Sequence, residues 1–539
     1  MGINRIAACA LACLILALPG LGLADPASGS TVYDTIVIGA GGGGLGAGAA
    51  LAKNGKKVLV IERHSKVGGY MTNFQRGPYS FEVSLHAMDG LNPGGFTRTT
   101  LTALGAMDKV KPVKLDPMYR TIYPGLTLDV PADVDAYCEL LKKNFPAESK
   151  GIDGLFKTMA GINRGMEILT SAMDKNNPQS ASVIFLKPWL FWPVLKYWNM
   201  TLSQMVHHFI HDEKLIAIFT QLSGFAGGEP DNVSAIFFAM MWNSYHFGGY
   251  YYFVGGSQSV SNALAQVITE NKGEIMLNTT VTKILLDKGA AVGVRTQDGK
   301  EYRSRYVVSN ANAPDTFFKM VGKENLPADY VKKLESLKIG LSSYVVYLGV
   351  NYDYRDKFPK GVHEMMITDS FDQAENFKYF YQGDIDKVSF AIADYSLVDP
   401  TAAPAGKSVI CITTIMPYDY KDGWYEKESY AKYRALKEET AKVLIKRAEK
   451  YLPGLGSHIE VMEVGSPRTM EHFTLNPRGT IFGWDNIPSQ SMLKRLKQET
   501  PIKNLYLAGA WTFPGGGQSA VISSGLMAAQ KILAQDKKK

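Results

Sequence analysis

Cysteine is scarce in this chain, and its scarcity excludes two kinds of chemistry. The 539 residues include four cysteines, and two of these, Cys9 and Cys13, lie within the first 24 residues. The other two, Cys138 and Cys411, are too far apart in sequence to form a C-x-x-C redox motif or a cysteine metal site. We therefore expect no metal centre. Two states stay open for this pair: one disulfide in an oxidising compartment, or two free thiols.

Long runs of one charge are also missing. The net charge is only +7, and the basic residues are scattered apart from the terminal Lys537-Lys538-Lys539, which reads as a solvated tail. Nucleic-acid binding therefore finds no support. With 46% apolar and 20% charged residues the composition is that of a globular protein, and 539 residues favour two packed domains over one simple core.

The apolar run near the N-terminus is too short to be a comfortable membrane span. Arg5 precedes the run Ile6–Leu18, and the small-residue pattern Gly22-Leu23-Ala24 follows it. A bilayer span needs about 20 apolar residues. This pattern predicts a cleaved secretory signal over residues 1–24, with an uncleaved anchor as the alternative. Export would lead to the periplasm of a bacterium, or to the endoplasmic reticulum lumen or the exterior of a eukaryotic cell, with peripheral membrane association.

Hydrophobic patterning after a polar linker predicts a β–α–β unit. It comprises a strand over residues 33–39, a glycine-rich turn, an Ala/Gly/Leu helix to about Asn54, and a second strand over residues 58–62. The region from about 110 to 250 is richer in helical patterns and aromatic residues. Further strands are expected over 281–286, 291–296, 302–309, 343–350 and 504–508, with helices over about 427–451 and from about Gln518.

The turn in this unit fits the pattern G-x-G-x-x-G. Gly39 permits a tight turn, Gly41 allows the backbone to approach a pyrophosphate, and Gly44 allows the helix to pack closely on the strand. Glu62 follows Gly39 by 23 residues, at the end of the second strand, where a carboxylate accepts ribose hydroxyls. Strand, glycines and acid in register together predict a dinucleotide-binding site.

A second strand–glycine–helix element lies near the C-terminus. The strand over residues 504–508 runs into Gly509, and the glycines 515–517 precede the final helix. A long cofactor that extends between both chain ends suits this arrangement. The N-terminus of the final helix could stabilise negative charge on a reduced flavin ring.

The sequence resembles the FAD-dependent phytoene desaturase, carotenoid isomerase and retinol saturase group. The matching segments are VIGAGGGGLGAGAALAKNGKKVLVIE at 37–62, VGGY at 67–70, VVSNANA at 307–313 and NLYLAGAWTFPGGGQSAVISSG at 504–525. They span nearly the whole chain after residue 30. The resemblance implies FAD as cofactor, with contacts from Gly39, Gly41, Gly44, Glu62, Gly69, Val281, Gly509 and Gly517.

One departure from the family pattern concerns the position after Gly509. Members often carry an acidic residue there that contacts the ribityl chain, whereas this chain has Ala510-Trp511. The departure bears on the ribityl and ring contacts. It also weighs against a flavin amine oxidase, in which the similar motif usually carries a glutamate.

Glu82 and His86 are the candidate catalytic residues. The stretch 81–86, FEVSLH, resembles a segment of retinol-saturase-like members in which an acid and a histidine follow an aromatic residue. A histidine near the flavin could move a proton while the flavin moves a hydride. A structural histidine bonded to backbone is the alternative for His86.

Two aromatic segments suggest a nonpolar ligand. Residues 183–198, VIFLKPWLFWPVLKYW, contain three of the seven tryptophans, two lysines and no acid, and Pro188 and Pro193 argue against a regular buried helix. This segment is either a contact with the membrane–water interface or a packed hydrophobic lid. Residues 245–253, YHFGGYYYF, suit a core or a pocket wall.

These inferences combine into one expected architecture and activity. We expect an α/β fold with an FAD-binding Rossmann-type domain of the two-dinucleotide-binding-domain flavoprotein kind and a discontinuous α+β substrate domain. The FAD-binding domain is expected over 31–110, 252–335 and 465–535, and the substrate domain over 111–251 and 336–464. The expected activity is desaturation, saturation or isomerisation at carbon–carbon bonds of an apolar carotenoid- or retinoid-like isoprenoid.

Two other functions stay open at this point, a flavin amine oxidase and a non-catalytic FAD-bound lipid carrier. No second G-x-G-x-x-G motif clearly supplies an NAD(P) site. A quinone, another redox protein and oxygen are therefore all compatible electron acceptors.

The signal-peptide interpretation makes a direct prediction. Residues 1–24 are removed on export, because the small residues before Asp25 form a cleavage pattern. N-terminal sequencing of the protein from its native host should begin at Asp25. A chain that begins at Met1 in the membrane fraction would indicate an anchor, and recovery from the cytosol would contradict export.

Overall fold

The computed structural model describes residues 32–172, 187–425 and 427–537, and from Val32 onward the chain packs as one compact unit. The predicted signal peptide lies outside the described residues, as do residues 183–186 of the aromatic segment. Within the described residues, no helix is both long enough and apolar enough to cross a bilayer.

The first sheet is built around the predicted β–α–β unit. Its strand order is β10-β2-β1-β13-β12-β11, and β19 also pairs with β13. Neighbours are parallel from β10 to β13 and between β13 and β19, whereas β11, β12 and β13 form an antiparallel meander. The strands are β1 (Val32–Ile38), β2 (Val58–Ile61), β10 (Glu274–Met276), β11 (Val281–Asp287), β12 (Ala290–Thr296), β13 (Glu301–Ser309) and β19 (Leu505–Leu507).

This topology brings distant parts of the sequence to one edge. Because β1, β2, β13 and β19 are mutually parallel, their carboxyl ends meet there. Gly39, Glu62, Asn310 and Ala508 are the residues that leave these four ends. The expected α/β fold of Rossmann type is confirmed, and the strands of this sheet come from the three segments expected for FAD binding. The domain boundaries themselves stay a prediction.

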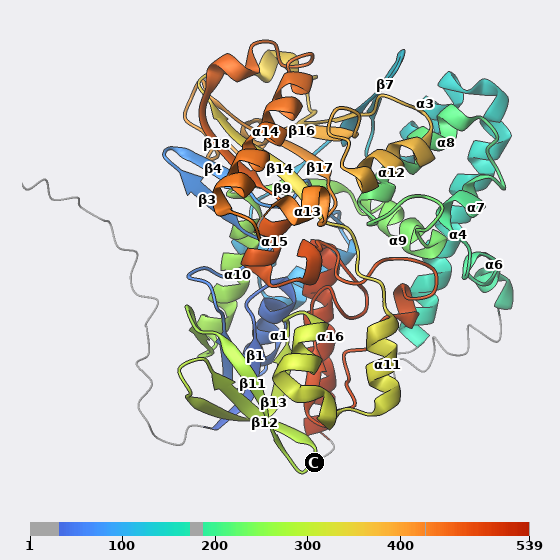
Figure 1. Ribbon diagram of the computed structural model, residues 1–539. Helices are drawn as coiled ribbons and strands as arrows, with labels where there is room; N and C mark the ends of the chain where they lie inside the picture. Colours follow the sequence, from blue (N-terminus) through green and yellow to red (C-terminus); the bar gives the residue numbers. More distant parts are fainter. Residues whose placement is uncertain (1–31, 173–186, 426, 538–539) are drawn as a thin grey trace, which may run out of the picture. The chain divides into compact units, whose positions relative to one another are not determined.

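Helices α1 (Gly42–Lys53) and α16 (Gln518–Asp536) lie side by side on this sheet (Figure 1). Helix α10 (Gly256–Glu270) packs against α1, and α2 (Phe96–Leu104) packs against both α1 and α16. Glycines disfavour an isolated helix by about 1 kcal/mol each relative to alanine. In α1 they permit close packing instead. A Cβ at Gly525 of α16 would lie 2.1 Å from the carbonyl oxygen of Gly43. A Cβ at Gly46 of α1 would lie 2.6 Å from the carbonyl oxygen of Ile522, so Gly46 and Gly525 together permit the close approach of the two chain ends.

The second sheet is almost entirely antiparallel and lies away from the first (Figure 1). Its order is β18-β14-β17-β16-β15-β7-β8, with only β15 and β7 parallel. Alternate residues of β14 enter different cores: Tyr344 and Val346 pack toward α14 (Tyr430–Ala448), whereas Val345 and Tyr347 face the core shared with the first sheet. The strands are β7 (Tyr119–Tyr123), β8 (Leu126–Val130), β14 (Ser343–Val350), β15 (Glu364–Ile367), β16 (Phe390–Asp394), β17 (Ser408–Ile415) and β18 (Ile459–Gly465).

The remaining elements connect these two sheets. A helical group flanks them, in which α4 packs against α6 and α9. It consists of α3 (Val134–Asn144), α4 (Ser149–Ala172), α6 (Trp192–Tyr197), α7 (Leu202–Val206), α8 (Glu213–Thr220) and α9 (Ala235–His246). The other elements are β3 (Asn73–Arg76), β4 (Tyr79–Glu82), β5 (Met88–Asp89), β6 (Pro112–Lys114), β9 (Tyr250–Phe253), α11 (Ala328–Ser336), α12 (Gln373–Gln382), α13 (Tyr420–Trp424) and α15 (Pro467–Thr474).

The two cysteines after the N-terminal segment are both free thiols. Cys138 is half-buried on α3, and Cys411 is buried in β17. Of the two states left open by the sequence, the structure has the free thiols. In the parts of the chain that the structure describes, no cluster of three or more His, Cys, Asp or Glu side chains could hold a metal ion.

Candidate active site

One cavity of about 730 Å³ extends from the carboxyl edge of the first sheet to the inner face of the second. Most of the residues expected to contact FAD line it: Gly39, Gly41, Glu62, Gly69, Val281, Gly509 and Gly517. Gly44 does not line it, because it faces the preceding turn: a Cβ there would lie 1.9 Å from the carbonyl oxygen of Gly39. Its position matches the role expected for it, close packing of the helix on the strand.

The start of α1 is built to admit an anion. Gly41 is the N-cap of this helix, no side chain caps it, and the first turn contains no acidic residue. A Cβ at Gly41 would lie 2.7 Å from Nδ2 of Asn310, and a Cβ at Gly43 would lie 2.4 Å from the amide nitrogen of Gly509. The glycines therefore let the start of α1 pack closely on Asn310 and Gly509, and Gly41, Gly42 and Gly43 line the cavity. The first helical N–H groups and the positive end of the helix dipole are thus available to an anion there.

Glu62 is held in place by backbone amides at the end of β2. Ala40 N donates to its Oε2 over 2.7 Å, and His64 N donates to its Oε1 over 2.8 Å. Its carboxylate remains part of the cavity wall, close to the strand β11 that begins at Val281. This is the geometry expected of an acid that accepts ribose hydroxyls. Glycine turn, acid and β11 together fit the long, doubly charged FAD.

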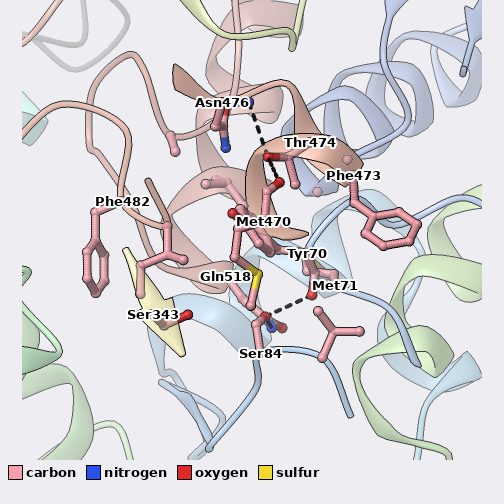
Figure 2. Close-up of a pocket in the computed structure, with 18 of the residues that line it drawn as sticks. Tyr70, Met71, Ser84, Ser343, Met470, Phe473, Thr474, Asn476, Phe482 and Gln518 are labelled. Atoms are coloured by element: carbon pink, nitrogen blue, oxygen red, sulfur yellow. Dashed lines mark hydrogen bonds between the residues drawn. The ribbon is translucent and has the colours of Figure 1, made fainter. Parts of the chain in front are cut away.

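The second helix N-terminus at the cavity belongs to α16. Gly517 is its N-cap, with φ of 107°, and again no side chain caps the helix and no acid occupies its first turn. The side chain of Gln518 donates through Nε2 to Ser84 Oγ over 3.2 Å, and Ser84 Oγ donates to Tyr70 O over 2.8 Å. Figure 2 shows the side chains of Gln518, Ser84 and Met470 together in the cavity.

Arg495 stabilises the C-terminal glycine loop, a role that sequence reasoning missed. It is 3% exposed, and its guanidinium donates to the carbonyl oxygens of Ala510, Phe482 and Trp484. Burial lowers its pKa to about 9, which the charge of Asp485 partly offsets. At the departure from the family pattern, Trp511 is buried. Its Nε1 donates to Asn476 Oδ1 over 3.1 Å, so the indole helps to fix the glycine loop in place.

The part of the cavity beside the second sheet is lined mainly by apolar and aromatic side chains, with Ser343, Thr368, Ser389, Thr413 and Thr414 as polar members. Tyr245 lines it, whereas the rest of the aromatic segment 245–253 lies in the core or at the surface. The buried thiol of Cys411 also lines it, and burial raises the pKa of that thiol well above its usual value, so it stays protonated. The other apolar lining residues include Phe225, Val345, Met366, Phe380, Phe390, Ala391, Ile415, Met470 and Phe482.

The two candidate catalytic residues have different surroundings, although both line the cavity. Glu82 is 4% exposed, and both its oxygens are engaged. Ser257 N donates to Oε2 over 2.8 Å, Ser257 Oγ donates to Oε1 over 2.7 Å, and Tyr252 OH donates to Oε2 over 3.3 Å. Burial raises the pKa of Glu82, against the lowering effect of the bonds from Ser257. This arrangement favours a structural role for Glu82.

His86, in contrast, presents one ring nitrogen to the cavity. Its Nδ1 lies 2.5 Å from Glu364 Oε1, and its ring lies against Phe225 with centroids 5.3 Å apart. Its Nε2 has no hydrogen-bond partner among the described residues. Burial lowers the pKa of His86, but the charge and hydrogen bond of Glu364, with a contribution from Glu82, outweigh this and raise it. A histidine in this state can hold a proton at Nε2 near neutral pH.

The glycine turn generates a sharp prediction. Gly41 has φ of −71° and ψ of 174°, which any residue adopts, and aspartate is a favoured N-cap. A Cβ at Gly41 meets only the end of the Asn310 side chain, which can move aside, so Gly41→Asp should fold. Its carboxylate would lie at the helix N-terminus and repel the pyrophosphate. We expect FAD affinity to fall about 10- to 100-fold, measured by flavin absorbance of the purified protein and by titration of the apoprotein.

Gly41→Asn is the matched control, because it adds nearly the same bulk without the charge and should lose less FAD. Circular dichroism and thermal unfolding of the apoproteins separate cofactor loss from misfolding. A folded Gly41→Asp protein with a full complement of flavin would contradict this assignment of the turn.

The names of known proteins with similar sequences refer to carotenoid or retinol substrates. The chain is 29% identical to a chloroplastic prolycopene isomerase of Arabidopsis thaliana, over 94% of this chain and 83% of that protein. It is 28% identical to a neurosporene-forming phytoene desaturase of Rhodobacter capsulatus, over 92% and 93% of the two chains. It is 25% identical to an all-trans-retinol 13,14-reductase of Danio rerio, over 88% and 82%.

The fold is also that of a solved flavoprotein. A structure of putrescine oxidase with bound putrescine superposes with a TM-score of 0.62 at 16% identity, covering 94% of this chain and 99% of that one. The model of the family described as flavin containing amine oxidoreductase matches residues 43–533. With its glycine turns, Glu62 and both helix N-termini on one cavity, this chain belongs to the flavin containing amine oxidoreductase family and is an FAD-dependent oxidoreductase.

Proposed function

We propose that this protein acts on carbon–carbon bonds of a long apolar isoprenoid of the carotenoid or retinoid kind, by desaturation, saturation or double-bond isomerisation. The observation that carries the proposal is the continuity of the cavity. The groove that fits FAD opens directly into an apolar chamber in which His86 presents a ring nitrogen. The names of the three relatives, an isomerase, a desaturase and a reductase of polyenes, support the same substrate class.

The protein and its cofactor have separate parts in this chemistry. When bound, FAD supplies the two-electron donor or acceptor. The chain holds the isoprenoid mainly by burial, because Phe, Met and Ile side chains make up much of the chamber wall. The same wall excludes water. Nε2 of His86 is placed to give a proton to a substrate carbon or to take one from it.

The charge distribution argues against an amine as substrate. An ammonium group is stabilised most strongly by a carboxylate that is free to pair with it. In this chamber Glu82 is saturated by hydrogen bonds, and Glu364 lies behind His86, whose raised pKa favours a positive ring. The likeness to putrescine oxidase is at 16% identity and shows the fold alone.

We further propose contact with a membrane surface through the described part of the aromatic segment, residues 187–198. Pro188 begins a short 3-10 helix and Trp192 begins α6, so the two prolines occupy early positions in short helices. The side chains of Trp189, Trp192 and Leu195 are 65%, 64% and 67% exposed, at intervals of three residues. Exposed apolar side chains next to the exposed Lys187 suit the interface of an anionic bilayer.

The buried face of this segment attaches it to the neighbouring helices. Phe191, Val194 and Tyr197 are buried, and α6 packs on α4 and α9. Trp198 is half-buried, with Lys494 Nζ 5.6 Å from its ring centroid. It therefore belongs to the packed face rather than to the exposed one. Export by residues 1–24 remains a further proposal, which rests on the charge and hydropathy pattern of that segment.

The proposed function is tested by turnover and by one substitution. Carotenoids and retinol in liposomes should be converted by the flavin-loaded protein, with products identified by chromatography and mass spectrometry. His86→Gln should lower kcat about 100-fold or more, as for other proton-transfer groups, with little change in flavin content. His207→Gln, at an exposed histidine on the surface, is the matched control and should leave turnover unchanged.

Other outcomes would identify the alternatives. Hydrogen peroxide produced on addition of amines, with no conversion of polyenes, would indicate an amine oxidase. A flavin spectrum that no reductant or polyene changes would indicate a lipid carrier. An unchanged kcat in His86→Gln would remove His86 from the reaction.

The membrane proposal predicts a separable effect. Replacing Trp189 and Trp192 with serine removes most of the exposed aromatic area, and each buried indole would contribute about 2 kcal/mol or more to interfacial binding. Sedimentation with anionic liposomes should fall strongly, and turnover of liposome-borne substrate should fall with it. Turnover of the same substrate in detergent should persist.

Tyr430→Ser is the control, since Tyr430 is 75% exposed on α14, outside this segment. It should leave liposome binding intact. A wild-type protein that does not sediment with liposomes, or a double variant that loses FAD, would make the segment a packed lid.

A further inference from the structure

A buried carboxylate stands directly behind His86. Glu364, the first residue of β15, has a fully buried side chain, and the side chain of His86 is 19% exposed. Glu364 does not line the cavity, whereas Met366, on the same face of the strand, does. Anything that Glu364 contributes to the reaction must therefore pass through His86.

This carboxylate has little other support. His86 Nδ1 donates to Oε1, but Oε2 is buried without a hydrogen-bond partner among the described residues. A buried ion pair typically costs more in desolvation than it returns, and replacing one with apolar side chains is often neutral or stabilising. An incompletely satisfied carboxylate in the wall of an apolar chamber is thus poorly explained by stability and points to function.

The backbone around His86 is fixed so that the ring has one orientation. His363 Nε2 donates to the carbonyl oxygen of His86 over 3.1 Å, and Tyr395 OH donates to that of Leu85 over 2.9 Å. With Nδ1 held by Glu364 and one face against Phe225, Nε2 is the nitrogen left to face the chamber.

The charges around the ring favour its protonated form. Burial raises the pKa of Glu364, yet the charge and hydrogen bond of His86, with a smaller contribution from His363, lower it overall. Burial lowers the pKa of His363, which leaves that ring neutral near pH 7. The ionisable groups around this pair include Glu82, Tyr119, Tyr245, Tyr250, Tyr252, Tyr347, Tyr395 and Cys411. All have raised pKa values, so the tyrosines and the thiol stay neutral.

We propose that Glu364 is a positioning residue that holds the His86 imidazole with Nε2 directed at the substrate chain, ready to exchange a proton with carbon. The proposal deepens the proposed function and rests on it. In saturation the Nε2–H bond breaks as a C–H bond forms, and the electron pair stays on Nε2. In desaturation a C–H bond breaks, its electron pair enters the new double bond, and Nε2 takes the proton. FAD, when bound, would supply or accept the hydride at the neighbouring carbon.

Glu364→Gln tests this role, because it keeps the size of the side chain and an oxygen that accepts from Nδ1 but removes the charge. The pKa of His86 should fall, and NMR of histidine-labelled protein measures it, with His86→Gln identifying the resonance. We expect kcat to fall about tenfold or more with KM nearly unchanged. The pH limb that reports His86 should move to lower pH in either reaction direction. A lower pKa lowers the pH at which His86 loses its proton, whether it acts as the acid or as the base.

Two further variants separate positioning from structure. Glu213→Gln neutralises the carboxylate of the exposed pair His207–Glu213 and should leave kcat and its pH profile unchanged. In a His86→Gln background, Glu364→Gln should cost almost nothing more, because the residue acts through the missing ring. Flavin content and thermal unfolding are measured for every variant.

Each outcome decides a separate point. An unmoved pH limb and an unchanged His86 pKa in an active Glu364→Gln enzyme would overturn the role of Glu364 alone. An equal loss of kcat with and without His86 would overturn it as well, by making the carboxylate independent of the ring. A wild-type protein that converts no polyene would overturn the proposed function, and this role with it.

Discussion

The close approach of α1 and α16 is the constraint on which the rest of the site depends. The two helices come from opposite ends of the chain, and their backbones meet because Gly46 and Gly525 carry no side chain: a Cβ at Gly46 would lie 2.6 Å from the carbonyl oxygen of Ile522, and one at Gly525 would lie 2.1 Å from that of Gly43. Their contact places two uncapped helix N-termini on one cavity, one beside Glu62 and the other beside Ser84. A cofactor with a charged middle and a redox ring at one end requires such a pair of anion-stabilising positions at a fixed separation. The parallel strands β1, β2, β13 and β19 supply that separation.

Most of the cofactor groove could be predicted from the sequence because its rules are local. A glycine turn between a strand and a helix, with an acid 23 residues later, identifies a dinucleotide site from one short segment of the sequence. Six strands of the first sheet were located to within one or two residues for the same reason, since each is an apolar run bounded by turn residues, whereas the three-residue β10 was missed. His86 and Glu82 could be named as candidates from their neighbourhood. Their different states could not, because the hydrogen bonds of Glu82 come from Ser257 and Tyr252, far along the chain.

Glu364, Asn310 and Arg495 were missed because their partners are distant in sequence. Glu364 meets His86 across 278 positions, and nothing in the residues around it indicates that contact. The one available signal was a charged residue at the start of the otherwise apolar strand EMMI, which is unusual for a fully buried strand. The side chain of Asn310 lies between the glycine turns at Gly41 and Gly509. Arg495 reads as an ordinary surface cation until the loop from Phe482 to Ala510 closes over it.

The segment from Val83 to His86 is also a mechanical link between the two sheets. Three of its carbonyl oxygens accept hydrogen bonds from side chains on or next to the strands of the second sheet, from Tyr347, Tyr395 and His363. Each such bond contributes about 0.5–1.5 kcal/mol net, and swinging the sheets apart would break all three together. The chamber wall at His86 is therefore tied to the second sheet, and any displacement of that sheet would also displace the histidine.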